Sequence, residues 1–354
     1  MQRRAFLGAA GLGLTGSLAG CTAVSNVFET TNSREPPLVE NRPDAIYIPT
    51  HREGMEMVGM GDAGGLKVGL MYSYAHRFWT VDPDGGSYVA TEVPLEADDS
   101  IHLMAVVWEA ETGVVVPSTD VTVELTNDDG LVYEEVVYPM FSQQMGVHYG
   151  DNVPLPGDDI YTAKVTVAGL PFERFGAFDG QFEQAATATI EFDYREGQRN
   201  DIPYSLLEDK QGQRGTVPRM EMEMPQGVAP SSLPGETIGE GKTETQDITF
   251  RAQAATDDRF GDTPYLLVSP KTRYNGYLVP QMGLSATVER DGETAFEGDL
   301  TPGLDPEAGL HYGAPVENLT PDDTVTVTID VPPLVARHEG YETAFFDVGS
   351  VTVE

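Results

Sequence analysis

The chain has 354 residues, and its 21 lysines and arginines face 57 aspartates and glutamates, a formal net charge of −36. This acidity excludes nucleic acid and anionic lipid surfaces as main partners, because both are bound through a basic face. A hydrophobic fraction of 40% is high enough to build folded cores. The acidic residues are spread through the chain, so we expect a halophilic source whose salt screens their repulsion; an ordinary acidic secreted protein is the alternative.

The N-terminus has the features of an export signal. Arg3 and Arg4 precede an apolar run too short to span a bilayer comfortably, as in twin-arginine signals, and Leu-Ala-Gly before Cys21 resembles a lipobox. Cys21 is the only cysteine, so disulfides within the chain are excluded and lipidation is its expected role. We predict a signal peptide over residues 1–20 and an extracytoplasmic protein anchored to the membrane through Cys21. Residues 21–64 are polar and rich in Asn, Pro, Glu and Gly, which predicts a flexible tether.

The region 65–196 consists of short alternating runs separated by turns rich in Gly, Asp, Asn and Pro. Period-two alternation predicts half-buried strands, and no convincing amphipathic helix appears. The predicted strands cover residues 66–74, 101–110, 120–125, 131–138, 160–167 and 186–194. Many short strands at this spacing indicate a β-sandwich.

Residues 197–245 interrupt this pattern with a segment rich in Met, Pro and Gly, which we interpret as a linker or a long ordered crossover. Its alternating Met220, Met222 and Met224 would share one face of an extended segment, which we interpret as a docking strip, with a soft-metal patch as the alternative. Alternating strands resume in region 246–354, at residues 247–256, 265–270, 283–290, 323–331 and 345–353. The sequence therefore predicts an all-β protein of two tandem β-sandwiches.

The second region repeats the first. VYPMFSQQMGVHYG at 137–150 is matched by LTPGLDPEAGLHYG at 300–313. Four landmarks of the first region recur after the same interval (311 − 148 = 163): Pro117 as Pro280, Pro139 as Pro302, His148 as His311, and Arg174 as Arg337. One constant offset over so many residues indicates an internal duplication.

Soft metal-binding side chains gather in the first repeat. His102 and Met104 are two residues apart in a predicted strand, so they share a face, and Met140, Met145 and His148 follow the strand 131–138 in a loop-like segment. Imidazoles with thioethers suit copper, especially Cu(I), better than magnesium or calcium. The alternative is a structural one, in which His102 is a satisfied strand histidine and Met104 a core residue.

The segments IHLMA and PMFSQQMGVHYGDNVPLPG resemble the bacterial periplasmic iron-transport accessory proteins, a family that includes a treponemal membrane lipoprotein. The resemblance covers most of residues 66–194 and, more faintly, 247–354. It implies immunoglobulin-like β-sandwiches, a dimer, a bound copper or related divalent ion, and help in delivering iron to a membrane permease.

This resemblance places His102, Met140 and His148 on the metal ligands of the family. Met104 stands where the family has glutamate, which implies a softer site less suited to Fe(III). The later Arg-His of the family is replaced by an Arg-Phe pair ending at Phe175, so the first repeat lacks that ligand.

The second repeat has the complementary set. His311 and His338 are present, while the other ligand positions are taken by Tyr265, Leu267 and Gly303. Neither repeat therefore has the whole set of ligands.

Two interpretations remain open. If the repeats pack as an intramolecular pseudo-dimer, His338 or His311 completes the site of the first repeat. Otherwise the first repeat binds metal alone, with Met145 or His76 as an additional ligand, and the chain could form a homodimer as the family does.

No enzyme class fits the motifs. The chain has no GxSxG elbow, no GxxxxGK[ST] phosphate loop and no HExxH helix, so we expect a binding protein, with a copper redox enzyme as an alternative. We predict an extracytoplasmic protein that binds copper or iron and assists metal uptake by a membrane permease. A structural or adhesive cell-surface lipoprotein that has lost the metal is the rival hypothesis.

Overall fold

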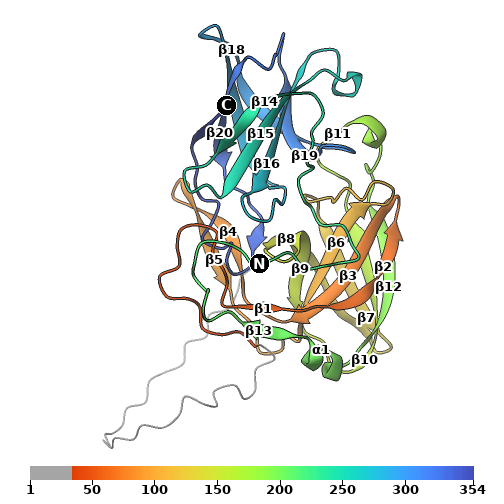
Figure 1. Cartoon of the computed structure of the whole chain (residues 1–354). Helices are drawn as coiled ribbons and strands as arrows, with labels where there is room; N and C mark the ends of the chain where they lie inside the picture. The colour runs from red at the N-terminus through yellow and green to blue at the C-terminus, as the bar shows by residue number, and fades with distance from the viewer. Residues whose placement is uncertain (1–33) are drawn as a thin grey trace, which may run out of the picture. The chain divides into compact units, whose positions relative to one another are not determined.

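The computed structural model describes residues 34–354, where the regular structure is almost entirely β-strand (Figure 1). The predicted signal peptide, twin-arginine motif and Cys21 lie outside the described residues. Within residues 34–354, regular helix is confined to three short segments: α1 Glu196–Asp201 and the 3-10 turns η1 Gly176–Phe178 and η2 Asp258–Phe260. The strands from β1 to β13 are β1 His51–Glu53, β2 Glu56–Ala63, β3 Leu66–Tyr74, β4 Phe78–Asp84, β5 Ser87–Val93, β6 Ile101–Glu109, β7 Val121–Asn127, β8 Gly130–Ser142, β9 Gly146–Val153, β10 Asp159–Val167, β11 Glu173–Arg174, β12 Ala186–Tyr194 and β13 Tyr204–Leu206.

The first β-sandwich is two sheets joined by one long strand. The first half of β8 pairs with β7 in the order β12-β10-β7-β8, and its second half pairs with β9 in the order β8-β9-β6-β3-β2. The change of partner falls between Val137 and Tyr138, next to Pro139, which has no N–H for a ladder bond. Alternation then places one face of each strand inside, as in β10, where Tyr161, Ala163, Val165 and Val167 are buried.

The second β-sandwich has the same plan. Its strands are β14 Glu236–Lys242, β15 Ile248–Ala255, β16 Tyr265–Thr272, β17 Gly283–Arg290, β18 Glu293–Asp305, β19 Gly309–Pro315, β20 Thr324–Val331, β21 Ala336–Arg337 and β22 Ser350–Val353. Like β8, the strand β18 joins β22-β20-β17 to β19-β16-β15-β14, and it changes partner next to Pro302. The bounds of β8 and β18 differ by 163 at both ends (293 − 130 and 305 − 142). The all-β tandem fold predicted from the sequence is confirmed.

The two repeats exchange a short strand. β21 of the second repeat runs parallel to β8 of the first, with Ala336 opposite Met140, and β11 of the first runs parallel to β18 of the second, with Glu173 opposite Gly303. The two exchanges are equivalent residue by residue, because each residue of one pair has its counterpart in the other pair 163 positions away (336 − 173 and 303 − 140). Each crossing is fixed by one further backbone bond: His338 donates its N–H to Phe141 O at 2.9 Å, and Phe175 donates to Leu304 O at 2.9 Å.

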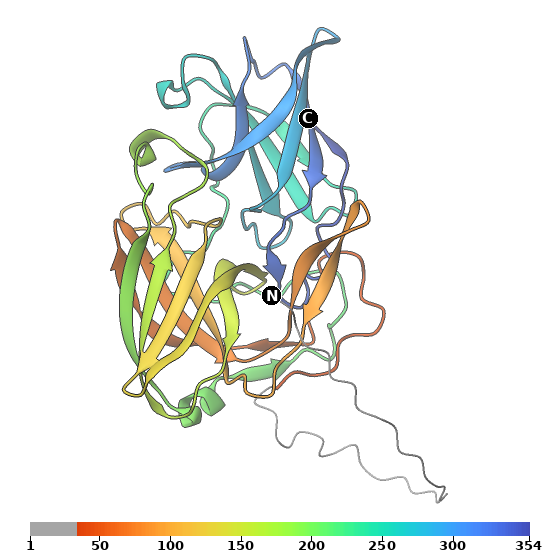
Figure 2. The ribbon, with the colours of Figure 1, turned by 180° about the vertical axis from the view of Figure 1, so that it is seen from behind.

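An inserted hairpin breaks this symmetry. β4 and β5 lie between β3 and β6, whereas the corresponding connection from β15 to β16 has only the short turn η2. β4 pairs antiparallel with β21 through Trp79 and Arg337, so the crossing strand in the first repeat is held on both sides. Figure 2 shows this orange hairpin beside the blue C-terminal part of the chain.

The tether predicted over 21–64 is wrong for its described part. β1 and β2 are strands, and Ala45, Ile46 and Tyr47 are buried, with Ile46 in the second core. Composition suggested flexibility, but buried apolar side chains and long-range pairing to β3 order this segment.

The linker predicted over 197–245 is also ordered. β13 pairs with β1, and β14 extends the second sandwich back to Glu236 rather than 246. Its methionine strip behaves as a docking strip: Met224 is buried and Met222 packs on the same cluster. Of the two alternatives for this segment, the long ordered crossover agrees with the structure, because its apolar residues pack against the sandwiches.

Candidate metal centre

The segment 137–150, expected to be loop-like, is a β-hairpin. It contains the end of β8, a turn, and the start of β9, and it places Met140 directly opposite His148. On the neighbouring strand β6, His102 lies opposite Asn152 and Met104 lies opposite Gly150. The three adjacent strands therefore bring His102, Met140 and His148 to one corner of the first sandwich.

Each residue of the repeated His-Tyr-Gly motif has a separate role in this corner. Tyr149 donates its hydroxyl to Val116 O at 2.8 Å, and Tyr312 does the same to Val279 O at 3.3 Å in the second repeat. The first bond holds the loop before β7 against β9, and the second holds the loop before β17 against β19.

The glycine of the motif leaves space for a ring on the neighbouring strand. A Cβ on Gly150 would lie 3.0 Å from His102 Nε2 and 3.4 Å from Met140 Sδ, and one on Gly313 would lie 2.4 Å from the ring of Tyr265. His102 Nε2 and the Met140 sulfur thus approach the same point above Gly150. A side chain here would enter the space between them.

Four of the six histidines of the chain meet at this corner. His338, carried across from the second repeat by β21, places Nδ1 3.0 Å from His76 Nε2 and Nε2 3.1 Å from His148 Nε2. Nitrogen atoms of His76, His102 and His338 all lie within 4.8 Å of one another. His76 lies between β3 and the inserted hairpin, and the connection between β15 and β16 in the second repeat contains no histidine.

Hydrogen bonds fix the tautomers of three of these rings. Nδ1 of His76 faces Tyr74 O at 2.9 Å and Nδ1 of His148 faces Gly146 O at 3.1 Å. A carbonyl oxygen only accepts, so each Nδ1 carries the proton and each Nε2 presents a lone pair.

Asn152 fixes the third ring. Its Nδ2 donates to His76 O at 2.8 Å, which turns Oδ1 toward His102 Nδ1 at 2.9 Å. His102 Nδ1 is therefore the donor as well, and its Nε2 is a buried lone pair without a hydrogen-bond partner. An imidazole whose second nitrogen is held by a carbonyl group is the usual arrangement of a metal-ligating histidine.

His338 cannot satisfy the lone pairs around it. A neutral imidazole has one N–H, so only one of its contacts to His76 and His148 is a hydrogen bond, and the other brings two lone pairs together. Protonation of His338 would satisfy both contacts, but burial and the surrounding imidazoles hold its pKa well below its usual value. A cation among the rings would remove this conflict, because every free nitrogen offers it an electron pair.

Burial also keeps the other rings neutral. It lowers the pKa of His76 and His148 to about 4 and that of His102 well below its ordinary value. The four rings are consequently uncharged at neutral pH and ready to bind a metal without losing a proton.

The remaining predicted ligands lie at different depths. Met140 is fully buried beside Phe78 and Ala336, with its sulfur facing His102 as described. Met104 and Met145 belong to an adjacent apolar cluster and line a cavity of about 80 Å³ that His76 and His338 also line. These two methionines therefore line the cavity beside the histidine cluster.

His311 does not join the cluster, so the interpretation in which it completes the first site is wrong. It lies at the matching corner of the second repeat with the ring of Phe175 at 5.4 Å and that of Tyr265 at 5.8 Å, and its Nε2 is buried without a partner. Each crossing strand enters the other repeat, so His338 leaves its own repeat and Phe175 arrives there.

Sequence reasoning undervalued two residues. The sequence offers His76 only as an additional ligand, whereas the structure places it in the cluster, 3.0 Å from His338 Nδ1. Asn152 was part of the motif Gly-x-His-Tyr-Gly-x-Asn, and that spacing on a strand was the available signal for its contact with His102.

Comparison with known proteins agrees with the resemblance seen in the residues. Residues 58–188 match the family model described as Fe2+ transport protein, and residues 231–354 match a model described as a domain of unknown function, DUF7350. The first repeat resembles the Fe2+ transport protein family. No curated protein matched the sequence.

Two similar solved structures are both of FetP from uropathogenic Escherichia coli. A copper-bound variant is 18% identical, with a TM-score of 0.29, over 40% of this chain and 92% of that one. FetP as isolated is 19% identical, with a TM-score of 0.28, over 41% of this chain and 96% of that one. Among residues 34–354, no helix has the length and apolar character needed to cross a membrane.

Proposed function

We propose that this chain binds a copper or iron ion outside the cytoplasm and assists its uptake by a membrane permease. The observation that carries the proposal is the set of Nε2 lone pairs on His76, His102 and His148, each fixed by a hydrogen bond on Nδ1. Those of His76 and His148 lie 3.0 and 3.1 Å from nitrogen atoms of His338, and that of His102 is buried without a partner. A buried polar atom without a partner is costly, and a neutral His338 can donate to only one of the other two lone pairs, so this cluster supports a ligand that accepts electron pairs.

The donor set favours copper. Imidazole nitrogens together with the thioether of Met140 suit Cu(I) and Cu(II). The glutamate of the resembled family is absent, because Met104 occupies its position. Iron as Fe(II) is compatible with the imidazoles, and Fe(III), which prefers hard oxygen ligands, is disfavoured. The metal is cargo that is bound and handed on rather than a group used in catalysis, and the chain acts as a binding protein.

An intramolecular pseudo-dimer takes the place of the dimer implied by the resemblance. The reciprocal exchange of β11 and β21 gives the first repeat a histidine on a foreign strand, as a partner subunit would. One chain therefore contains a whole site. We propose further that lipidation of Cys21 after export holds this unit near its permease in the membrane.

The test is metal analysis of the exported full-length protein. After removal of bound metal with a chelator, the parent and the variants His102→Ala, His148→Ala and His338→Ala are titrated with Cu(I), Cu(II) and Fe(II). The parent is expected to bind one equivalent, and each variant to lose it, while the matched control His311→Ala keeps it.

Equal trace metal in the parent and all variants would overturn the proposal and support the rival structural or adhesive lipoprotein. A His338→Ala variant that binds copper as tightly as the parent would remove the pooled site. Anomalous diffraction at the copper and iron edges on one crystal identifies the metal.

A further inference from the structure

One face of the first β-sandwich carries a group of methionines that the proposed histidine site does not use. In the pairing of β2 with β3, Met57 lies opposite Met71 and Met60 lies opposite Gly69. Residues directly opposite each other in an antiparallel pair point to the same face of the sheet. This face is turned away from the core of the sandwich, because Leu70, on the alternate side of β3, lies in that core.

A β-bulge brings the two exposed methionines of β2 to this face together. Met57 and Met60 are three residues apart, so a regular strand would point them to opposite faces. The register of β2 shifts between Met57 and Gly59, and this shift aligns both side chains with the face of Met71. Met57 and Met60 are 41% and 45% exposed. The bulge therefore places two thioethers side by side on an accessible surface.

The segment between the two sandwiches lays a further thioether on the same face. Met224 is buried, and its sulfur occupies the place that a Cβ on Gly69 would take, so only glycine permits this approach. The sulfur therefore lies next to Met60, across the strand pair, and next to Met71, two residues along β3. Met71 and Met224 also belong to one buried cluster. Four methionines thus gather at one place, and we call them the thioether patch: Met57, Met60, Met71 and Met224.

The chemistry of the thioether patch suits one kind of ion. Thioether sulfur is a soft ligand that selects Cu(I), whereas imidazole also accepts divalent ions and carboxylate prefers harder ones. The exposed Glu56 and Glu223 are sequence neighbours of Met57 and Met224, and the whole chain has a net charge of −36, so a cation is attracted to this surface. Two accessible sulfurs above two buried ones can receive an ion from solvent or from a carrier.

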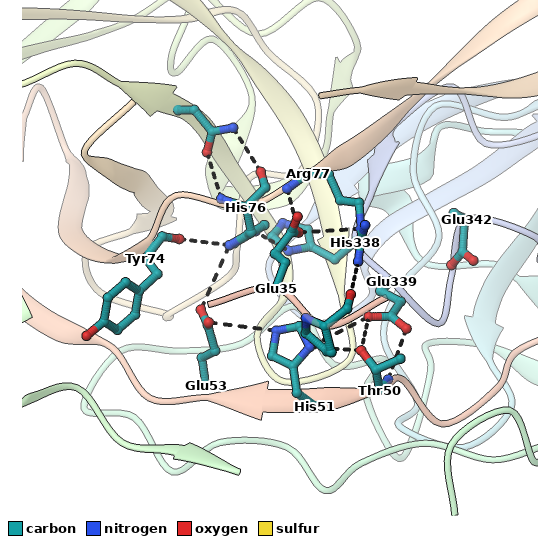
Figure 3. A network of polar contacts seen from close by, with 12 residues as sticks. Glu35, Thr50, His51, Glu53, Tyr74, His76, Arg77, His338, Glu339 and Glu342 are labelled. Atoms are coloured by element: carbon teal, nitrogen blue, oxygen red, sulfur yellow. Dashed lines mark hydrogen bonds and ion pairs between the residues drawn. The ribbon is translucent and has the colours of Figure 1, made fainter. Parts of the chain in front are cut away.

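A row of methionines leads from the thioether patch toward the histidine cluster. Met57 lies opposite Met71, and Met71 lies opposite Met104 in the pairing of β3 with β6. Met104 lines the cavity of about 80 Å³ that His76 and His338 also line. Figure 3 shows the polar side of this cavity, where carboxylates and histidines surround those two rings. The row therefore crosses three adjacent strands from the exposed surface to the thioether side of the cavity.

We propose that the thioether patch is a surface site for Cu(I), from which the ion passes along the row Met57, Met71 and Met104 to the histidine cluster. The patch holds Cu(I) and not Cu(II), because it offers only soft ligands. It binds the ion more weakly than the cluster does, so the one tightly bound equivalent expected above remains that of the histidines. The delivery step rests on the copper function proposed above, whereas binding of Cu(I) at the patch depends on different side chains.

The first experiment follows the methionine methyl groups of the full-length protein by NMR after ¹³C labelling. Ag⁺, a diamagnetic and redox-stable substitute for Cu(I), is titrated past one equivalent. Beyond the first equivalent, which the histidine cluster takes, the methyl signals of the thioether patch are expected to shift and saturate. The signal of Met282, which lies in the core of the second repeat, should stay unchanged. Zn²⁺ should leave the patch signals unmoved. Shifts confined to Met140, or equal shifts with Zn²⁺, would overturn the proposal.

The second experiment removes the two exposed sulfurs at nearly constant volume, in the double variant Met57→Leu and Met60→Leu. This variant is expected to lose the second Ag⁺. It should also load the histidine cluster from a Cu(I)–chelator complex at least about 10-fold more slowly, because no soft ligands receive the ion, while its final copper content equals that of the parent. The matched control Met282→Leu should behave as the parent in both measurements, and melting temperatures confirm that the variants fold.

The outcomes separate the site, the delivery step and the function proposed above. Retention of the second Ag⁺ in the double variant would overturn the site, and an unchanged loading rate would overturn the delivery step. The variant His102→Ala, which lacks a ligand of the cluster, is expected to keep the methyl shifts of the thioether patch. If the cluster of the parent binds no copper while the patch still binds Ag⁺, the function proposed above fails, and the delivery step fails with it, but the Cu(I) site stands.

Discussion

The matching corners of the two repeats differ in what fills the same backbone. In the first repeat, His102 lies opposite Asn152 and Met140 opposite His148. In the second, the corresponding pairs are Tyr265 with Pro315, and Gly303 with His311. The strands, the proline bend and the His-Tyr-Gly motif persist in both, so the scaffold does not depend on the ligands.

The second corner is closed by aromatic rings. Phe175 arrives on β11 as His338 arrives on β21, and it packs against Phe260 at 5.1 Å and Tyr265 at 5.4 Å. A Cβ on Gly303 would lie 2.5 Å from the Phe175 ring, so this ring occupies the space that the methionine side chain fills in the first repeat. A metal site at this corner therefore needs three things: ligands on the strands of the same repeat, a histidine on the strand that crosses from the other repeat, and the segment that carries His76.

The largest expected effect comes from removing a ligand on one side of the comparison. We expect His148→Ala to weaken copper binding by more than about 100-fold, because loss of a partner in the outer shell alone costs about 10–100-fold. Its counterpart His311→Ala, equally buried, is expected to leave copper affinity unchanged. Competition with a copper chelator measures both, and equal losses in the two variants would contradict a single site.

The comparison can be reversed by rebuilding the second corner. The combined variant Phe175→His, Tyr265→His and Gly303→Met is expected to bind a second equivalent of copper, because it restores three donors around His311 and removes the ring that blocks Gly303. This site should be about 10–100-fold weaker than the first, since it has no counterpart of His76 or Asn152. Calorimetric titration measures the number of copper ions bound per chain. The control is the variant Gly303→Met alone, which keeps the Phe175 ring and should still bind one equivalent of copper.

A smaller effect is expected from Asn152→Ala. This change leaves all ligands in place but frees the His102 ring and the backbone of His76, so copper affinity should fall about 10–100-fold. The variant Pro315→Ala at the equivalent position of the second repeat should have no effect on affinity. Unaltered copper affinity in Asn152→Ala would show that the outer hydrogen bond does not orient the ring.

A further expected effect is on the pH dependence of metal-free stability. The pKa values of His76 and His148 are lowered to about 4, so between pH 6.5 and 4 the unfolded chain binds more protons than the folded one. The contribution of these rings to the free energy of unfolding is therefore fully present above pH 6.5. It falls as the pH drops toward 4, by up to about 1.4 kcal/mol per pH unit for each ring.

Urea unfolding at pH 7.5, 6 and 5 measures this slope. Replacing both His76 and His148 by glutamine should flatten it by about two protons, while His311→Gln should remove about one, since the pKa of His311 is also lowered to about 4. An unchanged slope in the double variant would mean that other groups control acid unfolding.

The sequence alone was sufficient for the strands and the repeat. Alternation gave 66–74, 186–194 and 283–290 with the bounds that β3, β12 and β17 have in the structure, because one face of each strand is buried. The constant offset of 163 predicted two copies of one fold. It missed β4, β5, β9, β18 and β19, and also β1, β2, β13 and β14 in the segments predicted as tether and linker, and it took the hairpin at 137–150 for a loop.

For the candidate site, the sequence supplied the residues and the tertiary structure decided among them. His102, Met140 and His148 lie on adjacent strands, so pattern and resemblance together were enough to group them. The choice of His338 over His311 depends on which strand crosses to which repeat, a contact between residues 190 or more positions apart that no local periodicity records. Likewise, His76 follows the predicted strand 66–74, and only the pairing of β3 with β6 brings it beside the cluster.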